Sequence, residues 1–244
     1  MKLEQLLEGV PFTLVQGSLD TEVQDIIYDS RKAAPGLAFV CIVGTQRDSH
    51  EFAADCAAKG VSVLVIQHDI DLSAMPGVTV VKVESSRYAM ALMSGNLFGN
   101  PSRQMTMIGV TGTKGKTTVA ETACSVMNRM GLACGVIGSN GAAYAGKHVG
   151  TSNTTPESYE LMRLFRAMRD EGVRYVVMEV SSQALARHRV DGITFDTAVF
   201  TNLSPDHIGT EEHPDYAHYR DSKKRLFAQC RHGIFNADDP EAAY

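Results

Sequence analysis

The sequence predicts an α/β protein with a mainly parallel β-sheet. From residue 103 onward, short apolar runs that suit buried strands alternate with amphipathic segments that suit helices. A glycine-rich turn at residues 112–118 directly follows one such run, residues 107–110, and precedes a helical pattern. Ligands of open parallel sheets bind at the carboxyl ends of the strands, so the polar residues that follow each strand are the candidates for function.

Two domains are expected, because Asn100, Pro101 and Ser102 form a linker signal. The first, residues 1–100, is predicted to be mixed α/β, with strand candidates at residues 26–28, 37–43, 61–66 and 78–83. The second, residues 101–244, has strand candidates at residues 107–110, 133–137, 175–180, 197–201 and 233–236. Helices are predicted from Thr155 and from Tyr216, and also from Thr117, with an apolar face of Val119, Ala123, Val126, Met127 and Met130.

The composition is that of a soluble globular protein, with 44% hydrophobic and 21% charged residues. A formal net charge of −5 argues against general affinity for nucleic acid. The five cysteines are scattered without a CxxC pair, which favours reduced thiols. The N-terminus lacks the features of a signal peptide, and no apolar run approaches the about 20 residues of a membrane span. We therefore expect a cytoplasmic monomer without membrane or nucleic-acid partners.

The turn GTKGKTT, residues 112–118, has the character of a phosphate-binding loop. Loop N–H groups and a helix N-terminus attract anionic oxygens, Lys116 is placed to reach the outer phosphates, and the Thr117 hydroxyl suits Mg²⁺. The spacing departs from the usual motif, because Val110 stands where the first glycine belongs. An ordinary glycine-rich turn is the alternative, and we expect ATP and Mg²⁺ as cofactors.

Two further strand ends carry polar residues. Glu179 ends the apolar run of residues 175–180, and a buried carboxylate needs a cation, for which nucleotide-bound Mg²⁺ is the natural candidate. The segment TNLSPDH, residues 201–207, follows another strand. His207 alone is better explained as a hydrogen-bonded loop histidine, but its place after a strand of the same sheet favours a functional role.

The helix predicted at residues 216–227 puts Tyr219, Lys223 and Phe227 on one stripe, with Lys224 rotated away. A lysine on an apolar face would be desolvated, which favours the neutral amine. Such an amine can react with CO₂ to give a metal-binding carbamate. From the spacing alone, a lysine that extends its amine to solvent is the better explanation.

Taken together, GTKGKTT, NTTP (residues 153–156), MEVSS (178–182), HRV (188–190), TNLSPDH and KKRLF (223–227) resemble the Mur ligase family. The resemblance is closest to the UDP-N-acetylmuramoyl-tripeptide synthetases, and the DSR segment at residues 29–31 supports that branch. It implies an ATP-dependent amide-bond-forming enzyme of peptidoglycan synthesis. ATP would phosphorylate the carboxylate of UDP-N-acetylmuramoyl-L-alanyl-D-glutamate, and an incoming amino acid, diaminopimelate or lysine, would attack the acyl phosphate.

The resemblance also implies roles for residues. The catalytic residues would be Lys116, Glu179, His207 and Lys223. Thr117 and Glu179 would bind one Mg²⁺, and His207 with carbamylated Lys223 a second. ATP would contact Gly112, Thr113, Lys114, Gly115, Lys116, Thr117, Thr118 and Asn202. The muramoyl-peptide substrate would contact Ser30, Thr154, Thr155, Ser181, Arg187 and Arg189. From the residues alone, helix capping by Thr155 and solvation of the basic cluster at 187–189 explain those positions equally well.

The sequence departs from the family pattern at Lys114, where asparagine is common, at Gln183, where histidine is frequent, and at Arg187, where some members have glutamine. Family members have three domains and are nearly twice as long. The resemblance therefore implies an incomplete central ATP-binding domain and no C-terminal domain for the incoming amino acid. We expect these 244 residues alone to be inactive as a ligase.

Two alternatives remain at this point. One is another amide ligase of the same superfamily, such as folylpolyglutamate synthetase, cyanophycin synthetase or the ligase that amidates lipid-linked precursors. The folate enzymes begin close to the phosphate loop, whereas about 100 residues precede it here. The other is a nucleotide-binding chain that retains affinity for ATP or a UDP-sugar without catalysing a reaction.

Overall fold

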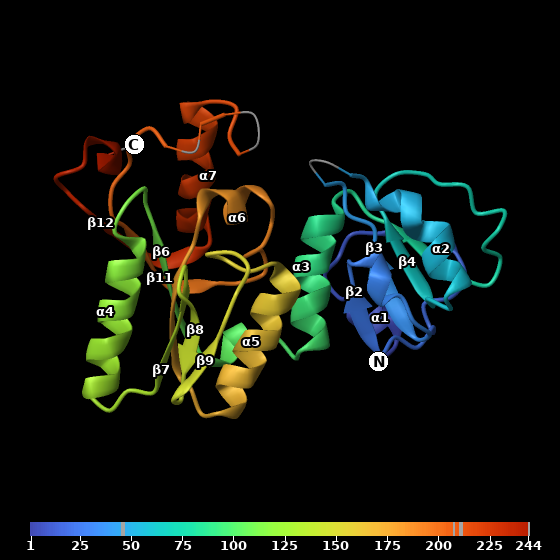
Figure 1. Ribbon diagram of the computed structural model, residues 1–244, viewed down its shortest axis with the longest axis horizontal. Coiled ribbons are helices and arrows are strands. Elements are labelled where there is room, and N and C mark those ends of the chain that lie inside the picture. Colours follow the sequence, from blue (N-terminus) through green and yellow to red (C-terminus); the bar gives the residue numbers. More distant parts are fainter. Residues whose placement is uncertain (45–46, 207, 210–211, 244) are drawn as a thin grey trace. The chain divides into compact units, whose positions relative to one another are not determined.

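The computed structural model describes residues 1–44, 47–206, 208–209 and 212–243. The chain forms two compact units, Met1–Gly99 and Asn100–Tyr244, each with its own sheet (Figure 1). Both sheets are mostly parallel, so the predicted α/β class is confirmed. None of the described helices is both long and apolar enough to cross a membrane.

The first unit is built on a five-stranded sheet in the order β1-β5-β4-β3-β2. Four strands are parallel and β1 runs antiparallel to β5; the bounds are β1 Thr13–Gln16, β2 Asp25–Ile27, β3 Leu37–Val40, β4 Val63–Ile66 and β5 Thr79–Lys82. Phe39, Leu64 and Val80 form one side of the core. The helices of this unit are α1 Leu3–Leu6, α2 Ala53–Ala58 and α3 Ser86–Leu97, with short 3₁₀ turns at Ser30–Lys32 and Ser49–Phe52.

Asp48 fixes the loop between β3 and α2. Its carboxylate contacts Nδ1 of the buried His50 at 2.5 Å and Nε2 of His68 at 2.7 Å. The other nitrogen of His50 accepts a hydrogen bond from the Gln67 N–H, at 2.9 Å, so the proton of a neutral ring lies on Nδ1. Both ring nitrogens of His50 therefore have hydrogen-bond partners. We infer that Asp48, His50 and His68 stabilise this loop and do not form a set of metal ligands.

The second unit contains a seven-stranded sheet in the order β12-β11-β6-β10-β7-β8-β9. The first five strands in this order are parallel, and β8 and β9 form an antiparallel extension at the edge. The bounds are β6 Thr106–Thr111, β7 Cys134–Gly138, β8 Gly141–Tyr144, β9 Lys147–Val149, β10 Tyr175–Glu179, β11 Phe195–Phe200 and β12 Cys230–Phe235. The central strands β6 and β10 thus end together, at Thr111 and Glu179.

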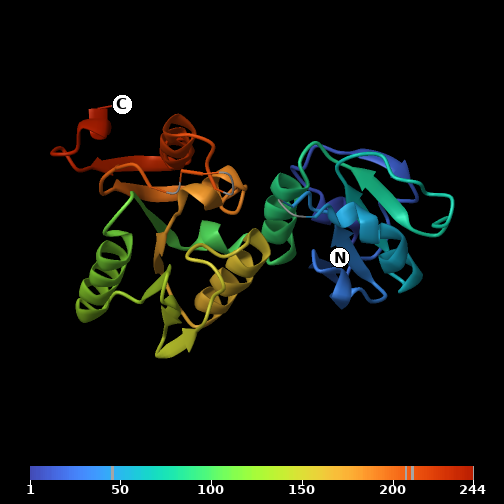
Figure 2. The same cartoon turned by 45° about the horizontal axis from the view of Figure 1, so that its top comes forward.

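Helices cover both faces of this sheet. Helix α4 (Lys116–Arg129) packs on the face of the sheet that carries Val110 and Val177. Helices α5 (Ser158–Asp170) and α7 (Tyr216–Ala228) pack on the opposite face, where a Cβ on Gly135 would meet α5 and a Cβ on Gly109 would meet α7. Short helix α6 (Ser182–Ala186) packs against α7, and Figure 2 shows α7 lying over β12. The strand-to-loop-to-helix order places β6, the glycine-rich turn and α4 in direct succession.

Two predicted details are wrong. Of the predicted apolar face of α4, Ala123 and Met127 do pack against the core, beside the buried Ala120 and Cys124, but Val119, Val126 and Met130 are exposed. Helix α5 begins at Ser158 instead of Thr155, because the Thr155 hydroxyl donates to the Glu179 carbonyl and does not cap the helix.

Gly109 in β6 is required by close packing, because a Cβ there would lie 2.9 Å from the Phe195 ring and 3.2 Å from a Leu226 methyl group. We expect Gly109→Ala to lower the free energy of unfolding by about 1–3 kcal/mol through overpacking. Gly150→Ala is the matched control, since nothing lies within 4 Å of the added methyl group. Urea denaturation of both variants measures the difference; equal stability would contradict the packing argument.

Candidate functional site

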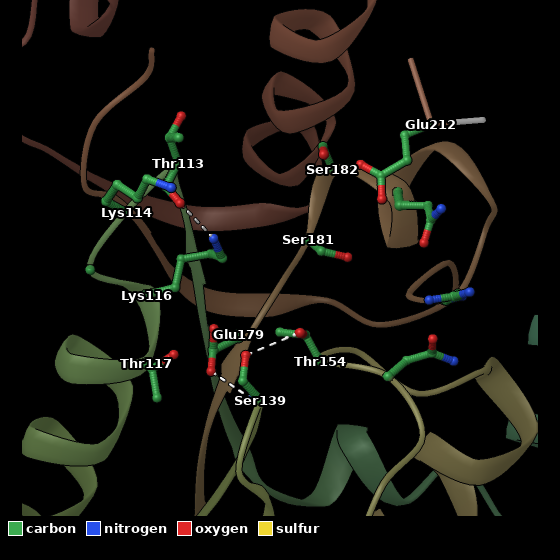
Figure 3. A pocket seen from close by; sticks show the side chains of 14 residues that line it. Thr113, Lys114, Lys116, Thr117, Ser139, Thr154, Glu179, Ser181, Ser182 and Glu212 are labelled. Carbon is green, nitrogen blue, oxygen red and sulfur yellow. Dashed lines mark hydrogen bonds between the residues drawn. The ribbon is translucent and has the colours of Figure 1, made fainter. Parts of the chain in front are cut away.

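A cavity of about 400 Å³ lies at the carboxyl ends of β6 and β10 in the second unit (Figure 3). It is lined by the glycine-rich turn, the first residues of α4, the end of β10, and the segments that follow β7 and β9. The lining residues are Thr113, Lys114, Gly115, Lys116, Thr117, Ser139, Asn153, Thr154, Glu179, Ser181, Ser182, Gln183, Arg189 and Glu212.

The glycine-rich turn is held in a fixed shape. Gly115 has φ = 84°, a left-handed conformation that glycine adopts without strain, and it leads directly into α4. Asn202, after β11, accepts a hydrogen bond from the Lys114 N–H and donates one to the Lys114 carbonyl, both at 3.0 Å. The buried Thr113 hydroxyl is 3.0 Å from the Tyr219 hydroxyl of α7. The turn is therefore braced from the end of β11 and from α7 before any ligand binds.

Lys116 begins α4 and folds back onto the turn. Its Nζ donates to the carbonyls of Gly112 and Thr113, each at 3.0 Å. Burial lowers the pKa of this amine from its ordinary value, while the carboxylate of Glu179 acts in the opposite direction. Lys114 is exposed instead, and its Nζ lies 3.0 Å from the Asp206 carboxylate.

Glu179 ends β10 and is only 1% exposed. Its Oε1 accepts the N–H of Ser139 at 2.8 Å, and a Cβ on Gly138 would collide with the same oxygen. Figure 3 shows Glu179 and Thr117 lining the cavity below the Lys116 amine. A carboxylate and a hydroxyl are oxygen donors of the kind that Mg²⁺ prefers, so these residues fit that ion.

The opposite wall is polar and tightly connected. The Thr155 hydroxyl accepts the Ser181 N–H at 3.1 Å, and the Thr154 and Ser139 hydroxyls are 3.0 Å apart. Arg189 is 5% exposed, and its guanidinium contacts the Glu157 carboxylate at 2.8 Å and the Thr155 carbonyl at 3.1 Å. Its Nε is buried without a hydrogen-bond partner among the described residues. One donor of a buried guanidinium thus remains unused beside the cavity.

Lys223 reaches the turn from α7. The structure confirms that this lysine is buried, with 3% exposure, and that Lys224 is exposed. Its Nζ donates to the Gly112 carbonyl at 2.9 Å and lies 4.5 Å from the Tyr219 ring centroid. Burial, and then the nearby charge of Lys116, lower the pKa of Lys223 to about 7. The two lysine amines therefore share one carbonyl acceptor.

A buried histidine that the sequence pattern does not single out lies behind the cavity wall, next to Glu212. His213 is fully buried, with Nε2 2.9 Å from the Ser182 hydroxyl and Nδ1 2.8 Å from Nδ1 of His218. These contacts join the segment before α7 to the start of α6 and so hold Glu212 at the cavity wall. The only signal in the sequence is a histidine within a polar segment, which does not distinguish burial from exposure.

The remaining predicted residues lie elsewhere. Thr118 is exposed on α4, and Arg187 directly follows α6 as its C-terminal cap; neither lines the cavity. Ser30 belongs to the first unit, where it begins the 3₁₀ turn capped by Asp29. His207 lies outside the described residues, so its predicted roles as catalytic residue and metal ligand are not placed.

Lys223 predicts a pH-dependent stability. Because its pKa falls from 10.5 to about 7 on folding, the unfolded chain binds more protons between these values, and the free energy of unfolding should rise with pH in this window. Lys223→Met should flatten the rise, whereas Lys224→Met should keep it. Urea denaturation between pH 7 and pH 10 measures the slopes; an unchanged slope in Lys223→Met would contradict the assignment.

Comparison with known proteins places this site in a family. Residues 110–244 match the model of the Mur ligase middle domain. The chain is 43% identical over 243 residues to the UDP-N-acetylmuramoyl-L-alanyl-D-glutamate–2,6-diaminopimelate ligase of Clostridium perfringens, covering 100% of this chain and 49% of that protein. It thus spans about half the length of the curated relatives it matches.

Solved structures agree in fold. A structure described as a UDP-N-acetylmuramoyl-L-alanyl-D-glutamate–2,6-diaminopimelate ligase superposes with a TM-score of 0.81 at 21% identity, over 100% of this chain and 48% of that one. The MurF ligase of Thermotoga maritima in complex with ADP gives a TM-score of 0.59 at 19% identity, over 91% of this chain and 47% of that one. The chain belongs to the Mur ligase family.

Proposed function

We propose that this chain binds ATP and UDP-N-acetylmuramoyl-L-alanyl-D-glutamate, as part of an ATP-dependent ligase that adds diaminopimelate to a peptidoglycan precursor. The observation that carries the proposal is the single cavity in which Lys116, Thr117 and Glu179 face Thr154, Ser181 and Arg189. A phosphate loop and a polar wall with a buried guanidinium suit phosphoryl transfer to a substrate carboxylate. The name of the 43% identical relative supports diaminopimelate over lysine as the amino acid added.

The loop would bind the nucleotide phosphates through the N–H groups of Gly115 and Lys116 and the N-terminus of α4. Lys116 would exchange its bonds to the Gly112 and Thr113 carbonyls for phosphate oxygens, which places its charge where negative charge develops. Thr117 and Glu179 would hold Mg²⁺, and a bound Mg²⁺ neutralises phosphate charge. Asn202 would keep the loop in shape through its two bonds to Lys114.

The opposite wall of the cavity would orient the substrate whose carboxylate accepts the phosphoryl group. The γ-phosphoryl group passes to the substrate carboxylate, which gives an acyl phosphate and ADP; the amine of the amino acid then attacks the acyl carbon and releases phosphate. Arg189, fixed by Glu157 and Thr155, would hold the peptide end by its unused Nε, together with the hydroxyls of Thr154 and Ser181. Ser30, in the first unit, would contact the uridine nucleotide.

Lys223 would supply a second anionic ligand after reaction with CO₂, which gives a carbamate and releases one proton. Its buried amine, with a pKa of about 7, is largely neutral at slightly alkaline pH and so is able to react. His207 would complete this second Mg²⁺ site. Thr118 and Arg187 would have supporting roles in nucleotide and substrate binding, respectively.

Nucleotide binding is the first test. We expect Mg²⁺–ADP to bind the chain, and Lys116→Ala to weaken binding by about tenfold to a hundredfold, because a charge-assisted hydrogen bond contributes about 1.5–3 kcal/mol. Lys224→Ala, at an exposed lysine, should leave the affinity unchanged. Isothermal titration calorimetry measures both. Equal affinities for the two variants would reject the phosphate-loop assignment.

Substrate binding is the second test. Calorimetry with UDP-N-acetylmuramoyl-L-alanyl-D-glutamate should show binding that Arg189→Lys weakens at least about tenfold, since lysine cannot reproduce the planar set of donors. Arg166→Lys, at a half-exposed arginine of α5, is the control. Circular dichroism confirms that the variants fold. Binding of Mg²⁺–ADP without any binding of this substrate would keep the nucleotide site and reject the peptidoglycan assignment.

A further inference from the structure

A second cavity of the second unit, of about 610 Å³, lies at the amino ends of the parallel strands, whereas the phosphate loop lies at their carboxyl ends. It is lined by residues at the amino ends of β6, β10 and β11 and by Arg231 in β12. The loop follows the carboxyl end of β6, a strand of six residues. At about 3.3 Å per residue the two sites lie on the order of 20 Å apart along the strand, so this cavity is separate from the candidate active site.

Three arginines from three segments line this basic cavity: Arg103 of the 3₁₀ turn before β6, Arg174 directly before β10, and Arg231 of β12. One carboxylate, that of Asp196, faces them. In the described parts of the chain, the side chains of Arg103 and Arg174 have neither a hydrogen bond nor an ion pair. Cations gathered in one hollow of a chain with net charge −5 repel each other without a counter-charge.

Asp196 is unable to serve all three guanidinium groups. Its Oδ1 contacts Arg231 at 3.2 Å, and its Oδ2 accepts the Met107 N–H at 2.8 Å, so both oxygens are engaged. The Arg174 backbone is held on both sides, because its N–H donates to Ala133 at 2.9 Å and its carbonyl accepts from Thr106 at 2.8 Å. The backbone that carries Arg174 is therefore held in place by the sheet, and all three arginines are exposed.

The strand order sets the size of the matching ligand. Arg174 precedes β10 and Arg231 lies in β12, and β6 and β11 run between them. Three strand spacings of about 4.8 Å put the two backbones on the order of 14 Å apart. Both arginines line the cavity, so a ligand that reaches both needs two anionic groups, each able to accept paired N–H bonds.

We propose that this basic cavity binds a small polyanion with two linked phosphate or carboxylate groups, bridged between Arg174 and Arg231 with Arg103 at its side. The hydroxyls of Thr106 and Thr194 line the same cavity and supply neutral donors. The proposal does not depend on the ligase assignment, because it concerns the other edge of the sheet. It adds a second anion site to the chain, remote from the phosphate loop.

Inorganic pyrophosphate is the probe, titrated by calorimetry into the Lys116→Ala chain so that the phosphate loop contributes little. We expect saturable binding to one site, weaker at higher salt and about tenfold tighter than binding of orthophosphate, which cannot bridge two arginines. Replacing Arg174 and Arg231 by Gln in the same background should weaken it at least about tenfold. Arg129→Gln, at an exposed arginine near the end of α4, should leave it unchanged.

A second measurement locates the ligand without a substitution in the cavity. Pyrophosphate should slow the modification of Arg103 and Arg174 by phenylglyoxal, detected by mass spectrometry, and should leave the modification of Arg129 unchanged. The proposal would be overturned if pyrophosphate still bound after the replacement of Arg174 and Arg231. Equal protection of Arg103, Arg174 and Arg129 from phenylglyoxal would also overturn it. Absence of saturable binding to a folded chain would overturn it as well.

Discussion

The carbonyl of Gly112 is the point on which the candidate site depends. Two lysine amines donate to it, Lys116 from the start of α4 and Lys223 from the middle of α7, at 3.0 and 2.9 Å. Burial lowers the pKa of both amines, and the charge of Lys116 lowers the pKa of Lys223 further. The turn between β6 and α4 is thus tied to a helix that lies more than 100 residues later in the sequence.

The parallel sheet explains why residues so distant in sequence meet there. Strands β6, β10 and β11 run in the same direction and in register, so Thr111, Glu179 and Phe200 end at one edge. The polar residues that follow each strand converge, and each contributes a different property: backbone donors from the turn, a buried carboxylate from β10, and the bracing amide of Asn202 after β11. The parallel direction and the register of these strands therefore assemble the candidate site as much as the residue types do.

The sequence allowed this convergence to be predicted, because short apolar runs followed by Gly112, Glu179 or Asn202 give strand ends directly. Helical periodicity also placed Lys223 on the apolar face of its helix, although spacing alone favoured a lysine that reaches solvent over the buried amine that the structure has. The exposed side of α4 was not predictable in the same way, since Val119, Val126 and Met130 have the same period as a buried face. Packing against the sheet decides which of the two apolar stripes of α4 is buried, and a single sequence does not reveal these packing contacts.

Local sequence patterns failed to predict secondary structure where a contact with a distant part of the chain decides the conformation. Thr155 before Pro156 has the pattern of a helix start, yet its hydroxyl bonds the Glu179 carbonyl and the Ser181 N–H. The strands β8 and β9 are short and contain Gly141 and Lys147, so neither apolar run nor alternation identifies them. In each case a tertiary contact supplies what the local pattern lacks, and the roles proposed for the site residues remain predictions.

The two cavities proposed to bind anions differ in how the charges of their lysines and arginines are balanced within the chain. At the phosphate loop each cation has an internal acceptor: Lys116 has carbonyls, Lys114 has Asp206, and Arg189 has Glu157. A ligand there would have to replace these bonds, so only a ligand that matches several of them at once would gain free energy, which would favour selectivity. At the far edge, Arg103 and Arg174 have no such bonds in the described chain. An anion there would displace water from these two arginines and would share Arg231 with Asp196, so the proposed site would recognise charge and spacing more than shape.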